Sequence, residues 1–256
     1  MLRDKIFDRQ GSAEAARHAG GEMARIEGLS DAVFAFAITL LVVSLEVPKT
    51  FDELFTAMRG FFAFALSFAL LFFIWHRQYQ FFRRYGLEDA WTLTLNGALL
   101  FVVLFFVYPL KFLSSLMVDQ ITGYPLTVHL PDGNVVPRVG PGQGATILII
   151  YGLGYAAVFL VFSLLYFHAY RQRGALRLDP FETLSARASI QESVIHTAIA
   201  LASVGTAFVG RERFASLAGC LYFALGPALT VHGTLMGRQR RRLEERLQRT
   251  AETSGG

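Results

Sequence analysis

The stretch ARIEGLSDAVFAFAITLLVVSLEVP, residues 24–48, contains the apolar run on which the fold depends. Only 14 uncharged residues, Ala32 to Leu45, separate Asp31 from Glu46. At about 1.5 Å per residue, such a helix covers roughly 21 Å, which is less than the ~30 Å hydrocarbon core of a bilayer. The run is therefore either a re-entrant or interfacial segment, or a span whose charged ends face protein or water. We favour a span.

The rest of the chain carries five longer stretches that are free of Asp, Glu, Lys and Arg. The composition agrees with a membrane protein, because 53% of the residues are hydrophobic and only 17% are charged, against about 25% charged in soluble domains. It excludes a secreted disulfide scaffold, a disordered chain and an ordinary cytosolic enzyme. The sequence thus predicts an all-α membrane protein with six transmembrane helices, the last five lying within residues 60–76, 90–110, 145–167, 193–210 and 214–237.

The placement of positive charge predicts the orientation. With the N-terminus in the cytoplasm and six spans, 18 of the 24 Lys and Arg residues fall in cytoplasmic segments. Cytoplasmic loops of membrane proteins carry this kind of excess. Removing the first span would put the N-terminus and the Arg77–Arg84 segment on opposite sides. We therefore expect a multi-pass protein of the cell membrane with both termini in the cytoplasm.

The segments outside the spans give the domain organisation. Residues 1–24 are expected to form a cytoplasmic N-terminal segment, and residues 25–237 the six-helix transmembrane domain. Residues 114–144 hold four of the eight prolines and read as an outside loop with a turn at 131–133. The tail, 238–256, is basic, which predicts contact with anionic lipid rather than with nucleic acid.

Motifs of enzymes and cofactor proteins are absent from the sequence. There is no phosphate loop, dinucleotide fingerprint, zinc-protease helix or nucleophile elbow, and the six histidines lack the spacing of metal ligands. The run Tyr151-Gly152-Leu153-Gly154-Tyr155 lacks the order of a potassium filter, so we interpret it as small-residue helix packing. We expect no enzyme activity, no metal site and no cofactor.

The first helix carries a more specific pattern, Arg25-x-x-x-Leu29-Ser30-Asp31, followed by an apolar helix that ends near Pro48. It resembles the opening helix of the transmembrane protein 175 family, which are potassium channels of prokaryotes and endolysosomes. The hallmark of that family is Arg-x-x-x-Phe-Ser-Asp, so Leu replaces Phe here.

A second stretch supports the resemblance. His76-Arg77 closes the second predicted helix, Leu95-Asn96 lies early in the third, and Pro109 follows. The resemblance covers roughly residues 24–112. Beyond residue 112 the match rests on topology alone.

The resemblance implies a concrete assembly. Single-repeat prokaryotic members form tetramers, in which the first helix of each subunit lines a central pore and its hydrophobic side chains make the constriction. Only one copy of the motif occurs in this chain, so a homotetramer is needed for one pore. The resemblance also implies that the permeant ion is potassium.

The helical period places an apolar face on residues 32–47. With 3.6 residues per turn, Ala32 and five further side chains fall on one side, away from Asp31. The family resemblance assigns the constriction to this face, with Phe36 in place of a smaller Ile or Leu. Ordinary packing within a helix bundle is the alternative. The pore-lining residues expected on this face are Phe36, Thr39, Leu40, Val43 and Val47.

The polar residues around the motif are expected to position the gate rather than to bind the ion. An acid within the membrane needs a partner, and nearby cations or amides supply one. The alternative for Ser30-Asp31 is a plain helix N-terminal cap. The family resemblance implies a network of Arg25, Ser30, Asp31, His76 and Asn96.

The overall prediction is a homotetrameric, potassium-permeable cation channel that has a hydrophobic constriction instead of a carbonyl filter. Two other classes remain open. A carrier of a small solute or proton would need a polar pocket in mid-membrane, and the spans hold few polar residues there. A membrane scaffold without transport would need a tightly packed bundle with no axial path.

Overall fold

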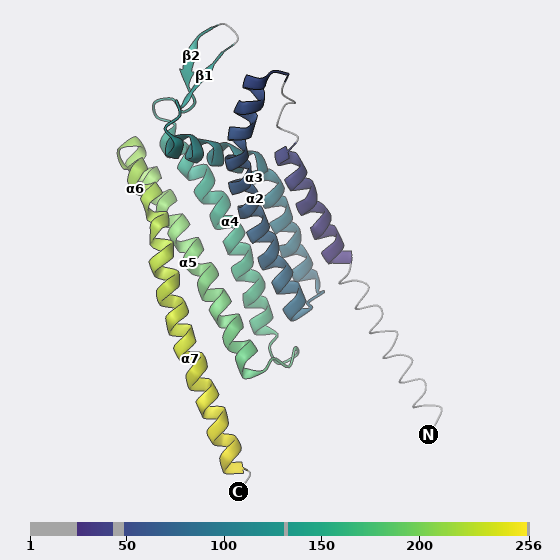
Figure 1. The fold of residues 1–256 in the computed structure, drawn as a ribbon. Helices are drawn as coiled ribbons and strands as arrows, with labels where there is room; N and C mark the ends of the chain where they lie inside the picture. The colour runs from purple at the N-terminus through teal and green to yellow at the C-terminus, as the bar shows by residue number, and fades with distance from the viewer. Residues whose placement is uncertain (1–24, 43–48, 131–132, 255–256) are drawn as a thin grey trace. The chain divides into compact units, whose positions relative to one another are not determined.

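The computed structural model describes residues 25–42, 49–130 and 133–254. The chain divides into two compact units, Met1–Ser115 and Leu116–Gly256. Figure 1 traces the helices of both units, which we describe separately.

The first unit consists of three helices. Residues 25–42 form the N-terminal helix, which is followed by α2 (Phe51–Tyr85) and by most of α3 (Ala90–Thr122). The side chain of Asp89 starts α3, because its Oδ1 accepts a hydrogen bond of 2.8 Å from the Thr92 backbone N–H. Apolar side chains from all three helices fill the core, including Phe34, Leu41, Leu71, Phe81, Phe82, Leu99, Val103 and Val107.

The second unit begins with the end of α3 and a hairpin. Strands β1 (Thr127–His129) and β2 (Val135–Pro137) pair antiparallel, with Val128 opposite Val136. The predicted turn at 131–133 falls between them, although residues 131–132 lie outside the described part. The remaining helices are α4 (Gly144–Arg171), α5 (Pro180–Gly210), α6 (Ala215–Cys220) and α7 (Leu225–Ser254), with short 3₁₀ turns η1 (Arg211–Phe214) and η2 (Leu221–Ala224).

The predicted helical membrane fold is confirmed. Besides residues 25–42, five helical segments are long and apolar enough to cross a membrane: Gly60–Tyr85, Ala90–Thr122, Gly144–Arg171, Pro180–Gly210 and Ala215–Arg249. The N-terminal helix, residues 25–42, is the sixth helix of the fold and is shorter than these five. The end of its predicted span, 43–45, lies outside the described residues.

The long helices all extend beyond their predicted spans, as α3 and α5 illustrate. α3 continues through Lys111 to Thr122, so the helix enters the segment predicted as a loop from residue 114. α5 begins at Pro180, where a capping box joins Asp179 and Glu182: each side chain accepts a hydrogen bond from the backbone N–H of the other. Charged residues limit an apolar span but not a helix, because a helix continues wherever its charges reach water or a partner.

A buried histidine is paired within the second unit. His196 of α5 is 5% exposed, and its Nδ1 lies 2.7 Å from the Tyr155 hydroxyl of α4. The Phe159 ring stacks on the imidazole, with the ring centroids 4.0 Å apart. This histidine therefore serves the packing of α4 on α5.

Small residues allow α4 and α5 to approach closely. Gly152 is buried in α4, and a Cβ atom at this position would lie 2.5 Å from Val204 Cγ2 and 3.3 Å from the Tyr222 hydroxyl oxygen. Real Cβ atoms do not approach other atoms this closely, so the contact requires glycine. The predicted small-residue packing at this position is confirmed.

We expect Gly152→Ala to reduce the free energy of unfolding by about 1–3 kcal/mol, because the added methyl group overpacks the α4–α5 contact. The matched control is Gly205→Ala in α5, where an added Cβ meets no atom within 4 Å. That change should leave stability unchanged or raise it by up to about 1 kcal/mol. Thermal unfolding in detergent measures both variants. Equal melting temperatures for the two would contradict the packing argument.

Candidate functional site

A buried cluster of three polar side chains joins the three helices of the first unit. Ser30, Gln78 and Asn96 are each at most 2% exposed. Gln78 Nε2 donates to Ser30 Oγ at 2.9 Å, and Asn96 Nδ2 donates to the same oxygen at 3.0 Å. Gln78 Nε2 also donates to Asn96 Oδ1. One hydroxyl group thus connects the N-terminal helix to both α2 and α3.

The Ser30 hydroxyl has no hydrogen-bonding capacity left. It donates to the Ile26 carbonyl oxygen at 2.9 Å and accepts two amide N–H groups. A hydroxyl offers one donor and two acceptor positions, so every position is used. In a buried site each of these bonds is costly to remove.

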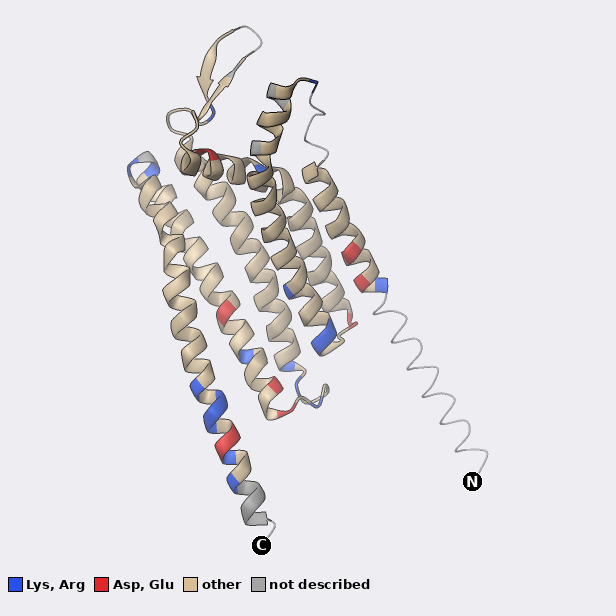
Figure 2. Ribbon diagram, viewed as in Figure 1, with Lys and Arg blue, Asp and Glu red and all other residues tan. Residues whose placement is uncertain are grey.

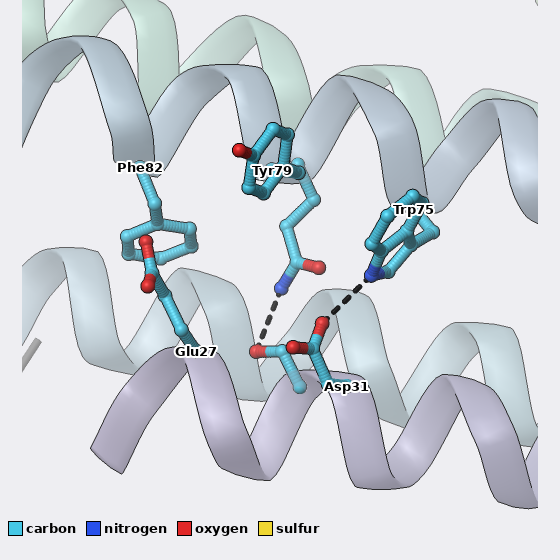
Figure 3. A pocket seen from close by; sticks show the side chains of 7 residues that line it. Glu27, Asp31, Trp75, Tyr79 and Phe82 are labelled. Atoms are coloured by element: carbon cyan, nitrogen blue, oxygen red, sulfur yellow. Dashed lines mark hydrogen bonds between the residues drawn. The ribbon is translucent and has the colours of Figure 1, made fainter. Parts of the chain in front are cut away.

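Asp31, next to the cluster, binds the indole of α2. Trp75 Nε1 donates to Asp31 Oδ1 at 2.7 Å. Figure 3 shows this bond beside a small crevice between the N-terminal helix and α2. Carboxylates line one side of the crevice and aromatic rings the other; its lining residues are Glu27, Ser30, Asp31, Trp75, Gln78, Tyr79 and Phe82.

The predicted polar residues fall into two groups. Ser30, Asp31 and Asn96 lie together at one level of the first unit. Arg25 is exposed at the start of the described helix. His76 is exposed on α2, where its Nε2 lies 2.8 Å from Gln80 Nε2 and its ring stacks on Phe72.

Two residues of the site were missed by the sequence analysis. Trp75 and Gln78 are three positions apart, so they share one face of α2, whereas His76 between them points elsewhere. The three-residue spacing of these two polar side chains, at the end of an apolar run, could have predicted that they share a helix face. The cap alternative for Ser30 fails, because the helix already includes residue 25 and Ser30 lies inside it.

The predicted apolar face is exposed in the single chain. Phe36 is 56% exposed, Ala32 and Thr39 are exposed, and Leu40 is half-buried. Val43 and Val47 lie outside the described residues. The Thr39 hydroxyl donates to the Ala35 carbonyl oxygen at 2.8 Å.

The opposite face of the same helix is buried. Its residues recur at intervals of three or four, as an amphipathic helix requires; they are Ser30, Phe34, Ala37 and Leu41. The polar cluster therefore fixes the rotation of the helix about its axis, and that rotation presents Phe36 to the outside. Within the described residues, no group of His, Cys, Asp and Glu side chains fits a metal ion.

We expect Asn96→Ala to lower the free energy of unfolding by about 1–3 kcal/mol, because it removes one hydrogen bond each from the buried Ser30 hydroxyl and the buried Gln78 amide. Thr94→Ala is the control on the same helix, since that exposed hydroxyl bonds to the Ala90 carbonyl of its own turn. Melting temperatures in detergent compare the two variants. A loss in Thr94→Ala as large as that in Asn96→Ala would refute the role of the cluster.

The part of the chain that contains this site matches the sequence pattern of a known family. The sequence pattern of the family described as "Endosomal/lysosomal potassium channel TMEM175" matches residues 25–106. This region includes the N-terminal helix, α2 and the part of α3 that carries Asn96.

Two prokaryotic potassium channels are similar to this chain in sequence. A potassium channel of Marivirga tractuosa is 39% identical over 227 residues, which are 88% of this chain and 92% of the relative. A potassium channel of Chamaesiphon minutus is 32% identical over 105 residues, which are 38% of this chain and 52% of the relative.

Two solved structures are similar in fold. The crystal structure of a variant of the potassium channel MtTMEM175, bound to a nanobody–MBP fusion, has a TM-score of 0.72 and 39% identity, and covers 84% of this chain and 93% of that chain. A lysosomal potassium-selective channel TMEM175 homolog from Chamaesiphon minutus has a TM-score of 0.53 at 23% identity, and covers 82% and 97%. The second likeness concerns the fold alone.

Proposed function

This chain belongs to the TMEM175 family, and we propose on that premise that it forms a potassium-permeable cation channel. The family is one of ion channels and not of enzymes, and the chain is a multi-pass membrane protein. The observation that carries the proposal is the exposed apolar face of the N-terminal helix, centred on Phe36, inside the region that matches the family.

In a bilayer, lipid covers exposed apolar side chains, so the exposure of this face does not by itself require a partner. The match of this helix to the family of potassium channels supports a pore instead. In a homotetramer, four N-terminal helices around an axis turn four copies of this face toward each other. In this arrangement Phe36, Thr39 and Leu40 line the path, and Val43 and Val47 continue it. A narrow apolar constriction controls ion flow by excluding water. Four phenyl rings form a tighter constriction than smaller aliphatic side chains.

The polar network is proposed to hold the constriction in place. Ser30 and Asn96 anchor the helix, and Asp31 adds its bond to α2. Arg25 and His76 are exposed in the single chain and are assigned contacts with the neighbouring subunit. Ion coordination is not assigned to Asp31, because its carboxylate is bound to the Trp75 indole.

The charge distribution supports an orientation in the cell membrane with both termini in the cytoplasm. In the second unit, Arg171 closes α4, and Figure 2 shows Lys and Arg gathered along the C-terminal half of α7. Positive residues favour the cytoplasmic side. We assign residues 1–24 and 238–256 to the cytoplasm, residues 25–237 to the channel domain and the hairpin segment within 114–144 to the outside. α7 crosses residue 238 without a break, so the basic tail is continuous with the last span.

We expect liposomes that contain the purified protein and are loaded with potassium to release it without valinomycin. Phe36→Ala should raise the release several-fold, because loss of the phenyl ring lets water into the constriction. Val42→Ala is the matched control: this side chain is 47% exposed on the same helix but lies about 120° from Phe36. Parallel sodium release measures selectivity, which we expect to change in Thr39 variants.

Other outcomes decide against the channel. Saturable transport with counterflow would favour a carrier. The absence of flux from folded wild type and from Phe36→Ala would favour a scaffold. Equal increases in potassium release for Phe36→Ala and Val42→Ala would contradict the placement of the constriction on this face.

A further inference from the structure

α3 carries one charged residue within its apolar length. Lys111 is the only Asp, Glu, Lys or Arg between Asp89 and Asp119. The helix does not end there but continues to Thr122, so the lysine lies within the helix and is half-buried. A cation in such a position is costly unless it meets a partner.

The partner lies on the N-terminal helix. Lys111 Nζ donates a hydrogen bond of 3.0 Å to the carbonyl oxygen of Leu41. Leu41 is fully buried and lies in the last turn of the described helix. An ammonium group is a strong hydrogen-bond donor, so this carbonyl oxygen satisfies part of its need for a partner.

The N-terminal helix is thus held to α3 at two levels. Asn96 binds Ser30 toward one end, and Lys111 binds Leu41 toward the other. Ser30 and Leu41 are 11 residues apart, which is about 16 Å along the axis. Both lie on the buried face, opposite Phe36. The polar cluster fixes the rotation of the helix, and the lysine fixes the lateral position of its far end.

We propose that Lys111 is a positioning residue for ion conduction, which holds the far end of the N-terminal helix against α3. This inference rests on the proposed function, in which the exposed face lines the pore. In the tetramer, a helix pulled toward α3 leaves the path around Thr39 and Leu40 wider. Without the ammonium group this end moves toward the axis, and the path narrows.

We expect Lys111→Met to lower potassium flux about tenfold, since the bond it removes is a hydrogen bond to a charged donor. Lys111→Arg should restore most of the flux, because a guanidinium group also donates to the carbonyl. Lys111→Gln, which is neutral but still a donor, should be intermediate and serves as a second variant if Lys111→Met does not fold.

Arg138→Met is the matched control for charge. It removes a cation that pairs with Asp119, the next charged residue of α3 after Lys111. If loss of positive charge at the outer end explained the effect, both variants would lower flux. Equal losses in Arg138→Met and Lys111→Met would therefore overturn the positioning role.

Hydrogen exchange gives a readout that does not depend on flux. In Lys111→Met, amides of residues 38–42 should exchange faster, whereas those around Ser30 should not. Unchanged exchange at residues 38–42 would overturn the inference. A wild type without flux would overturn the proposed function and the conduction role with it, whereas a conducting wild type matched by Lys111→Met would overturn only the role of Lys111.

Discussion

The Ser30 hydroxyl is the point on which the first unit depends. It uses its one donor and both acceptor positions, and its partners come from three helices. Bonds of this kind are strong in a low-dielectric interior and tolerate little displacement. Because each amide must reach the same oxygen, the helices have one mutual rotation and one relative height.

That constraint determines which side of the N-terminal helix packs against α2 and α3 and which side stays exposed. Phe34 and Ala37 lie on the Ser30 side and are buried, whereas Phe36, about 200° from Phe34, is exposed. Two charged groups beside this helix also find partners within the unit. Trp75 donates to the Asp31 carboxylate, and the Lys111 ammonium group donates to the Leu41 carbonyl oxygen.

The second unit is built by a different rule. α4 and α5 approach each other through Gly152 and through the stacked Phe159–His196 pair. Lipid offers no hydrophobic drive between helices, so close packing and occasional hydrogen bonds hold them together. In the first unit polar bonds fix the position of a helix, whereas in the second small residues and rings do so.

The sequence by itself determined the helical membrane class, the number of helices, the motif around Ser30 and the apolar face of residues 32–40. These are local properties, because hydropathy and the 3.6-residue period are read along one helix. Only the tertiary structure decided that Gln78 and Trp75 complete the cluster, that His76 lies on the exposed face, and that α3 runs through Lys111 to reach Leu41. Each of these depends on the rotation and height of one helix against another. Hydrogen bonds between residues 18 to 70 positions apart determine that placement. The sequence of a single helix does not contain this information.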